Sequence, residues 1–146
     1  MDELDRKILK SLIEDGRASY REISKRVGAP PATVHARVKK LMSLGVIKGF
    51  APVIDPVKLG LELTALILVR ASGPYLVEVE KDIAEYENVC AVYDITGEYD
   101  IAVVARFRGR EELNRFVKRL LAHRHVERTF TSIVLNVVKE DFTPRP

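Results

Sequence analysis

Glycine and proline residues divide the first fifty residues into three short segments in which apolar side chains recur at helical spacing. The first segment covers residues 2–14 and stops before Gly16, and the second stops at Gly28. Two consecutive prolines open the third segment, where a proline in the first turn loses no hydrogen bond, and Gly45 ends it. A short helix, a tight turn containing glycine and a longer basic helix predict a helix-turn-helix.

The second and third segments carry their own start signals. Ser19 stands at the position of a helix N-cap, and Glu22 follows three residues later, which is the spacing of a capping box. The third helix is expected to begin at Pro30 and Pro31 and to continue to about Leu44. The tight turn therefore lies between two helices with well-marked ends.

The region around the third segment contains no acidic residue. No Asp or Glu occurs from Ile23 to Ile54, although the whole chain has 24 Lys and Arg against 21 Asp and Glu. Residues 1–50 carry eleven bases and six acids, a balance of +5, and residues 51–146 carry thirteen and fifteen, a balance of −2. All the positive excess lies in the first third of the chain, as expected for a part that meets a polyanion.

The third segment has two chemically different sides. Val34, Val38 and Leu41 form one stripe, which predicts that they face a core. The opposite side has small residues near its start, which let a helix enter the major groove, and lysines near its end, which reach phosphates. Thr33 and His35 are placed to read base edges. The predicted DNA-binding residues are Arg21, Lys25, Pro31, Ala32, Thr33, His35, Ala36, Arg37, Lys39, Lys40 and Lys48.

The pattern changes after the third segment. Residues 46–55 roughly alternate apolar with small or polar side chains, which predicts a short hairpin or wing. We expect a DNA-binding domain over 1–50, a wing and linker over 51–60 and a second domain over 61–146. In the second domain, strands are expected over 63–71, 89–96, 101–107 and 129–138, and helices over 74–86 and 111–122.

The order of these elements is βαββαβ. The chain is therefore predicted to be an α+β protein, with an N-terminal winged helix-turn-helix and a C-terminal ferredoxin-like βαββαβ domain whose two helices cover one face of an antiparallel sheet. The other face would be an exposed apolar patch in a monomer. A dimer that buries two such faces is expected.

Several classes of function find little support. Cys90 is the only cysteine, which excludes an intrachain disulfide, and no apolar run reaches the length of a membrane helix. The polar start of the chain indicates an intracellular, cytoplasmic protein, and the absence of Gln is typical of a thermophilic source. His123 and His125 stand two residues apart, which is poor spacing for a helical metal pair. No catalytic motif, metal site or cofactor is predicted.

The order of motifs resembles one known family. LDRKILKSLIEDGRASYREISKRVG, VHARVKKLMSLGVIKGF, PVKLG and TGEYDI together are similar to the leucine-responsive/asparagine regulator (Lrp/AsnC) family of prokaryotic transcription factors. The resemblance implies a winged helix-turn-helix, then an effector-sensing (RAM) domain, with pairing through the sheets and further assembly into octamers. Such proteins usually have Ser or Thr where this chain has Pro30, which has no side-chain donor or acceptor.

The TGEYD segment has two interpretations. Its residues alone favour a hairpin turn, with glycine for positive φ and acids for solubility. The resemblance implies that it borders an amino-acid effector pocket between dimers. Glu98 or Asp100 would then accept from the ammonium group, and the Gly97 amide or a hydroxyl of the last strand would bind the carboxylate. The predicted effector residues are Gly97, Glu98, Tyr99, Asp100, Thr129, Thr131 and Ser132, of which Thr131 and Ser132 should face opposite ways.

The sequence therefore predicts a sequence-specific, DNA-binding transcriptional regulator that binds double-stranded DNA as a homo-oligomer and senses an amino acid. One alternative is an architectural, weakly specific DNA-binding protein without a ligand. The other is an enzyme similar to the haem-pathway decarboxylases that resemble this family. That enzyme would need cationic and imidazole side chains that converge in the second domain, and the candidates are Arg70, Arg106, Arg128, His123 and His125.

Overall fold

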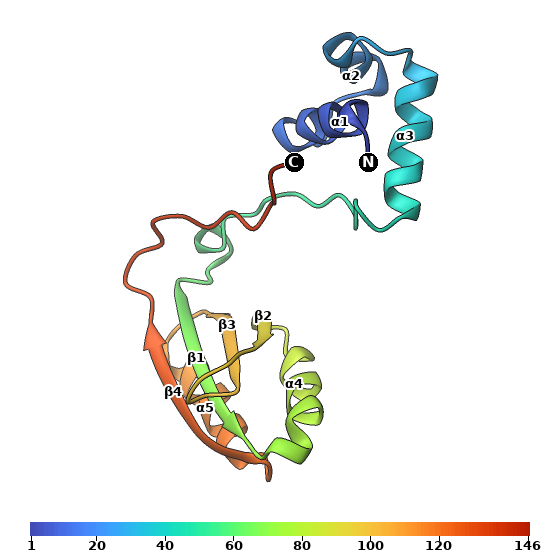
Figure 1. Cartoon of the computed structure of the whole chain (residues 1–146). Helices are drawn as coiled ribbons and strands as arrows, with labels where there is room; N and C mark the ends of the chain where they lie inside the picture. Colours follow the sequence, from blue (N-terminus) through green and yellow to red (C-terminus); the bar gives the residue numbers. More distant parts are fainter. The chain divides into compact units, whose positions relative to one another are not determined.

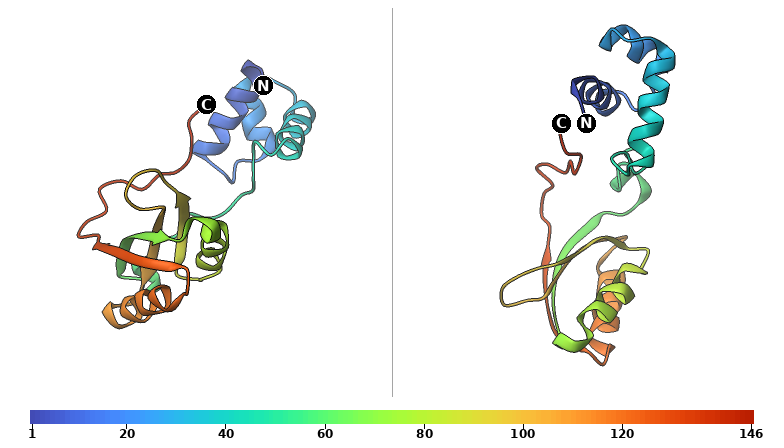
Figure 2. Two further views of the ribbon diagram at one scale, coloured as in Figure 1. Left: turned by 60° about the horizontal axis from the view of Figure 1, so that its bottom comes forward. Right: turned by 45° about the vertical axis from the view of Figure 1, so that its right-hand side comes forward.

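The computed structural model describes residues 1–146 and divides into two compact units. The first unit comprises Met1–Val53 together with Lys139–Pro146, and the second comprises Ile54–Val138. Figures 1 and 2 show the helices of the first unit and the sheet of the second. The helices are all too short or too polar to cross a bilayer.

The first unit is a bundle of three helices, as its spacing predicts. These are α1 (Glu3–Glu14), α2 (Tyr20–Val27) and α3 (Pro31–Ser43) (Figure 1). One side chain or more from each helix is almost fully buried in a common core, which contains Ile8, Ile23, Val34 and Val38. The helices are short, so burial of this shared apolar face is what holds each of them in place.

Both of the first two helices begin with a capping box. In α2, the Glu22 amide donates to Ser19 Oγ at 3.2 Å and the Ser19 amide donates to Glu22 Oε2 at 2.7 Å, as predicted. In α1, Asp2 and Asp5 form the same reciprocal pair, at 2.9 and 3.0 Å. At the end of α2, Gly28 takes a left-handed conformation with φ of 70°, which ends the helix and opens the turn to α3.

The hairpin expected over residues 46–55 does not form. These residues contain no strand. The amides of Val46 and Ile47 instead donate to Leu41 O at 2.9 and 3.2 Å, which holds the start of the segment against the end of α3. Pro52 has no amide hydrogen to donate to a strand partner, so alternation of side chains was not sufficient for a β ladder here.

The second unit contains a four-stranded antiparallel sheet. Its strands are β1 (Leu63–Ala71), β2 (Val89–Asp94), β3 (Ile101–Phe107) and β4 (Val126–Ile133), in the order β2-β3-β1-β4. The last strand begins and ends earlier than the predicted 129–138. Its pairing runs from Ala71↔Val126 to Ala65↔Ile133, so the antiparallel β4 ends opposite the first residues of its partner β1.

Two helices cover one face of this sheet. They are α4 (Leu76–Ala84) and α5 (Arg110–Ala122), and short 3₁₀ turns precede β1 and α4 at Val57–Leu59 and Gly73–Tyr75 (Figures 1 and 2). Alternate residues of β1 and β3 join both helices in one buried cluster, which includes Ala65, Ile67, Val69, Ile101, Val103, Phe107, Val79, Ile83, Phe116 and Leu120. The predicted ferredoxin-like arrangement is confirmed.

The opposite face of the sheet is open and largely apolar. Strand register places Tyr93, Ala102, Leu68 and Phe130 in one row across it, because directly opposite residues of antiparallel strands project to the same side. Tyr93 is 47% exposed and Phe130 is 54% exposed. Leu66 lies in the neighbouring row and is 41% exposed. Throughout, the open face means the side of the sheet away from α4 and α5.

Candidate nucleic-acid interface and effector turn

Helix α3 presents a basic, acid-free side to solvent. Val34, Val38 and Leu41 are at most 2% exposed, so the predicted stripe is the buried side of the helix. Lys39 and Lys40 are exposed on the other side, after the small residues of the first turns. The predicted DNA-binding residues that the structure leaves exposed are Arg21, Lys25, Pro31, Ala32, His35, Ala36, Lys39, Lys40 and Lys48, while Thr33 and Arg37 are partly buried.

Arg37 is committed to contacts within the unit. Its Nη1 atom donates to Asp2 Oδ2 at 2.5 Å and to Asp5 Oδ1 at 3.0 Å, and its side chain is 30% exposed. The hydrogen bond from Arg37, together with that from the Asp5 amide, lowers the pKa of Asp2 from 3.8 to about 2. The two carboxylates in turn raise the pKa of Arg37. This triad ties the first turn of α1 to the middle of α3.

The start of α3 has no side-chain cap. Pro30 is the N-cap residue and makes no capping hydrogen bond, and the first turn contains no acid. In α1 and α2, by contrast, a carboxylate or hydroxyl accepts from a first-turn amide. The positive end of the α3 dipole is therefore not neutralised by the chain's own side chains.

An aromatic residue outside the predicted DNA-binding set lies beside His35. Tyr20, at the start of α2, has its ring centroid 5.0 Å from that of His35, with 38° between the ring planes. Tyr20 is 40% exposed. The signal available in the sequence was the position of Tyr20 directly after the Ser19 cap, at the start of the helix that precedes the basic one.

The turn between β2 and β3 is held by contacts of Glu98 and Tyr99 with β4 and, separately, by hydrogen bonds of Asp100. Gly97 has φ of 117°, which only glycine adopts readily, so the hairpin interpretation of this residue is confirmed. Glu98 forms an ion pair with Arg128 of β4. The Arg128 guanidinium lies over the Tyr99 ring, 5.1 Å from its centroid. The Tyr99 ring is 6.3 Å from that of Phe130 on the open face.

Asp100 has a structural role in this turn. Its Oδ2 atom accepts from the Ala71 amide at 2.9 Å, at the bulge that ends the β1–β4 pairing. Its own amide donates to Val69 O at 3.0 Å, and its carbonyl accepts from the Ile95 amide at 2.8 Å. One carboxylate oxygen of Asp100 is thus already used to join the turn to β1.

The structure does not bring all seven predicted effector residues together. Thr129 and Thr131 lie opposite Val69 and Ile67, on the side of the sheet that the helices cover. Ser132 lies opposite Leu66 and so projects from the open face. Thr131 instead lines a hollow of about 440 Å³ beside α5, together with Arg110, Glu111, Leu113, Asn114 and Val117.

The residues that a decarboxylase-like site would need are also spread apart. Arg70 lies opposite Arg128, at one end of β1, and forms an ion pair with Glu127 at 3.3 Å. Arg106 lies opposite Thr64, near the other end of the same strand. These positions are six residues apart along the strand, which is roughly 20 Å. Arg106 therefore does not converge on one cavity with Arg70 and Arg128.

Both units match known protein families. Residues 1–48 match a family described as winged helix-turn-helix DNA-binding, and residues 64–144 match the Lrp/AsnC ligand binding domain. The chain is 51% identical over 146 residues to an uncharacterized HTH-type transcriptional regulator of Pyrococcus furiosus, covering 100% of this chain and 99% of that relative. It is 44% identical over 140 residues to the HTH-type transcriptional regulator FL11 of Pyrococcus horikoshii, covering 96% and 93%.

Solved structures agree with these matches. Escherichia coli AsnC superimposes with a TM-score of 0.92 at 28% identity, covering 100% of this chain and 99% of that chain. A transcriptional regulator of Neisseria meningitidis in complex with L-Met superimposes with a TM-score of 0.88 at 30% identity, covering 97% and 94%. The relatives from Pyrococcus fit the thermophilic composition. The chain belongs to the Lrp/AsnC family of transcriptional regulators, with a DNA-binding helix-turn-helix and an Lrp/AsnC ligand-binding domain.

Proposed function

We propose that this regulator reads specific DNA sites with α3 and that an amino acid bound at its second unit modulates this binding. The observation that carries the DNA-binding part is the exposed side of α3, where Lys39 and Lys40 have no acidic partner and small residues precede them. Phosphates supply the negative charge that this surface lacks.

The residues of α3 divide between two tasks. His35 and Thr33 contact base edges in the major groove, and Ala32 and Ala36 let the helix approach closely. Lys39 and Lys40 bind the backbone, as do Arg21 and Lys25 of α2 and Lys48 beyond α3. The uncapped amides after Pro30 offer a phosphate a further place at the positive end of the helix. Arg37 serves the unit's stability, because Asp2 and Asp5 hold it.

The effector part of the proposal depends on the turn at Gly97–Asp100. Glu98 and Arg128 form an ion pair there, and these are the two charges that an α-amino acid needs for its ammonium and its carboxylate. An amino acid that displaces this pair would keep both charges satisfied. The Neisseria relative has been solved with L-Met, which supports an amino acid as the ligand class.

The open face of the sheet is proposed to pair with that of a second copy, and dimers to assemble further. Two recognition helices related by a two-fold axis then favour pseudo-palindromic sites whose half-sites lie a helical turn or a multiple apart. Effector binding would act by favouring one assembly over another.

The test is fluorescence-anisotropy binding to the DNA upstream of its own gene and to a scrambled duplex across a range of salt. Lys39→Ala/Lys40→Ala is expected to weaken binding and to reduce the salt slope by up to about 2, because two phosphate contacts are lost. The matched control is Lys81→Ala/Lys118→Ala, which removes two exposed lysines from the second unit.

Each outcome has a consequence. Tighter binding to the upstream duplex, lost in the α3 variant and kept in the control, supports the proposal. Equal binding to both duplexes would favour an architectural protein instead. An equal salt slope in the wild type and the α3 variant would remove α3 from the interface.

A further inference from the structure

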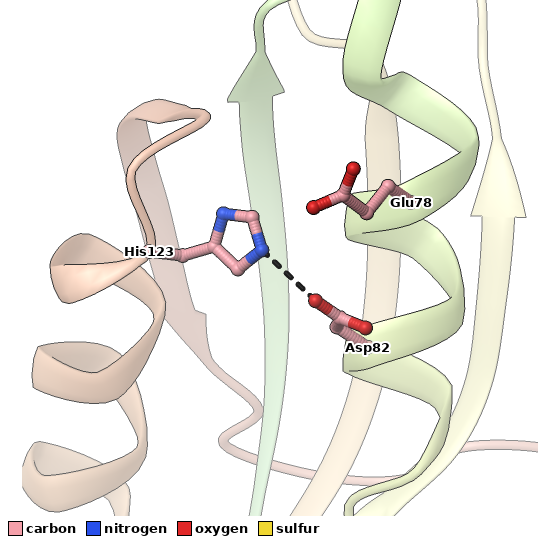
Figure 3. A group of neighbouring side chains, drawn as sticks. All are labelled: Glu78, Asp82 and His123. Carbon is pink, nitrogen blue, oxygen red and sulfur yellow. Dashed lines mark hydrogen bonds and ion pairs between the residues drawn. The ribbon is translucent and has the colours of Figure 1, made fainter.

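Three possible metal ligands from separate parts of the second unit lie side by side. Glu78 and Asp82 are one turn apart on the same side of α4, and His123 caps the end of α5. One ligand atom from each residue lies within 4.8 Å of the others. Figure 3 shows the imidazole extending from α5 toward both carboxylates. This group, Glu78, Asp82 and His123, is called the α4–α5 cluster below.

The cluster is accessible and already favours a cation. The side chains of Glu78, Asp82 and His123 are 47%, 53% and 21% exposed, so an ion can reach all three from solvent. Two carboxylates and the negative end of the α5 dipole face the same point. Arg124 is a nearby cation, whose Nη2 atom lies 3.8 Å from Glu78 Oε1 and whose side chain is 78% exposed.

His123 Nε2 is oriented into the cluster. It lies 3.0 Å from Asp82 Oδ2, while Nδ1 accepts from the His125 amide at 3.1 Å. Without a metal, this arrangement places the imidazole hydrogen on Nε2, where it is donated to Asp82. A metal at Nε2 moves that hydrogen to Nδ1, and the short turn from His123 to His125 must then release its internal hydrogen bond.

We propose that the α4–α5 cluster binds a divalent transition-metal ion of the zinc class. The imidazole nitrogen favours a transition-metal ion such as Zn²⁺ or Co²⁺, which also binds carboxylate oxygens, whereas Mg²⁺ and Ca²⁺ prefer oxygen ligands alone. Bound metal connects α4 to the end of α5, the two helices that cover the sheet. It replaces the single hydrogen bond between His123 and Asp82 with bonds to one ion.

The test is titration of untagged full-length protein with Co²⁺, followed by competition with Zn²⁺. Cys90→Ser serves as the background, because this exposed thiol is another possible zinc ligand. We expect one ion per chain, a visible Co²⁺ absorption band that Zn²⁺ removes, and a higher Tm in the presence of Zn²⁺. Asp82→Asn and His123→Ala should each weaken binding at least tenfold. Glu87→Gln, which removes an exposed carboxylate from the same unit, should leave it unchanged.

Arg124→Ala provides an independent test of the opposite sign. Removal of this competing cation from Glu78 should tighten Co²⁺ binding several-fold. Because the Arg124 side chain is exposed, the variant is expected to fold as the wild type does. The proposal is overturned if Asp82→Asn binds Co²⁺ as tightly as Glu87→Gln. It is also overturned if the wild type binds no Co²⁺ at micromolar concentrations, or if Arg124→Ala does not bind more tightly than the wild type.

Discussion

At the scale of single residues, Arg37 was compatible with two roles in the sequence, a phosphate contact or an ion pair within the unit, and the structure shows the ion pair. A base on the recognition helix is a natural partner for phosphate, and for that reason the sequence predicts Arg37 as a DNA-binding residue. In the structure, its guanidinium contacts Asp2 and Asp5 at the first turn of α1. These acids lie more than thirty residues away in sequence, so only folding brings them to Arg37.

The triad predicts an acid-dependent loss of stability. The folded pKa of Asp2 is about 2, below its ordinary 3.8, so its contribution is fully present above about pH 4 and is lost as the pH falls toward 2. Asp2→Asn is expected to lower Tm at pH 7 and to flatten the dependence of Tm on pH between 4 and 2. Thermal melts followed by circular dichroism measure both. Glu3→Gln, an exposed neighbour in the same turn, should change neither as much.

A second prediction concerns Glu98, which forms an ion pair with Arg128 at the turn proposed to bind the effector. Loss of a charged hydrogen bond weakens binding by roughly ten- to a hundredfold. Glu98→Gln is therefore expected to weaken amino-acid binding by at least about tenfold in isothermal titration calorimetry, with L-methionine and the other common amino acids as probes. Glu87→Gln is the charge-matched control. Absence of heat with every amino acid for the wild type would contradict the sensor proposal while leaving the DNA-binding proposal standing.

At the scale of elements, local signals in the sequence set where the helices begin and end. The spacing of Ser19, Glu22 and Gly28 predicts a capping box and a helix stop, and both are present. The prediction of a hairpin over residues 46–55 was wrong. Alternation of side chains does not supply the partner strand that a β ladder needs. Helix termination is local, whereas strand formation depends on a second segment.

Gly28 lies in the turn between α2 and α3, and Gly49, which follows α3, serves as its matched control. A Cβ atom would meet nothing within 4 Å at either position, but only Gly28 has a positive φ, of 70°. Gly28→Ala is expected to lower the free energy of unfolding by about 1–2 kcal/mol, the cost of a left-handed alanine. Gly49→Ala should have a much smaller effect. Urea unfolding measures the difference, and equal midpoints for the two variants would contradict the argument.

At the scale of the whole molecule, the open face of the sheet would leave apolar side chains exposed to water in a monomer. Its rows of apolar side chains include Leu66, Leu68, Val104 and Phe130, and Leu66 lies on the central strand β1. Apolar surface of this kind in a soluble protein commonly marks an interface. Helices α4 and α5 pack on the other face, so the open face is the side of the sheet that we propose to bind a second copy.

Leu66→Lys is expected to convert the proposed dimer to a monomer, because a charged side chain would be buried without a partner at the proposed interface. Sedimentation velocity at micromolar concentration measures the mass. Val77→Lys, at a residue of α4 that is 62% exposed, introduces the same charge away from the sheet and should leave the assembly intact. An unchanged mass for Leu66→Lys would place the interface elsewhere.

The sequence by itself determined the three helices of the first unit, the buried and exposed sides of α3 and the order of strands and helices in the second unit. These features depend on periodicity, caps and charge, which act between residues close in the chain. Only the tertiary structure decided the partners of Arg37 and Glu98, the face of the sheet on which Thr131 and Ser132 each lie, and the α4–α5 cluster. It also placed Lys139–Pro146, which the sequence predicts to be part of the second domain, with the first unit. These contacts join residues tens of positions apart, and no local pattern records which distant side chain will complete a charge or cover an apolar surface.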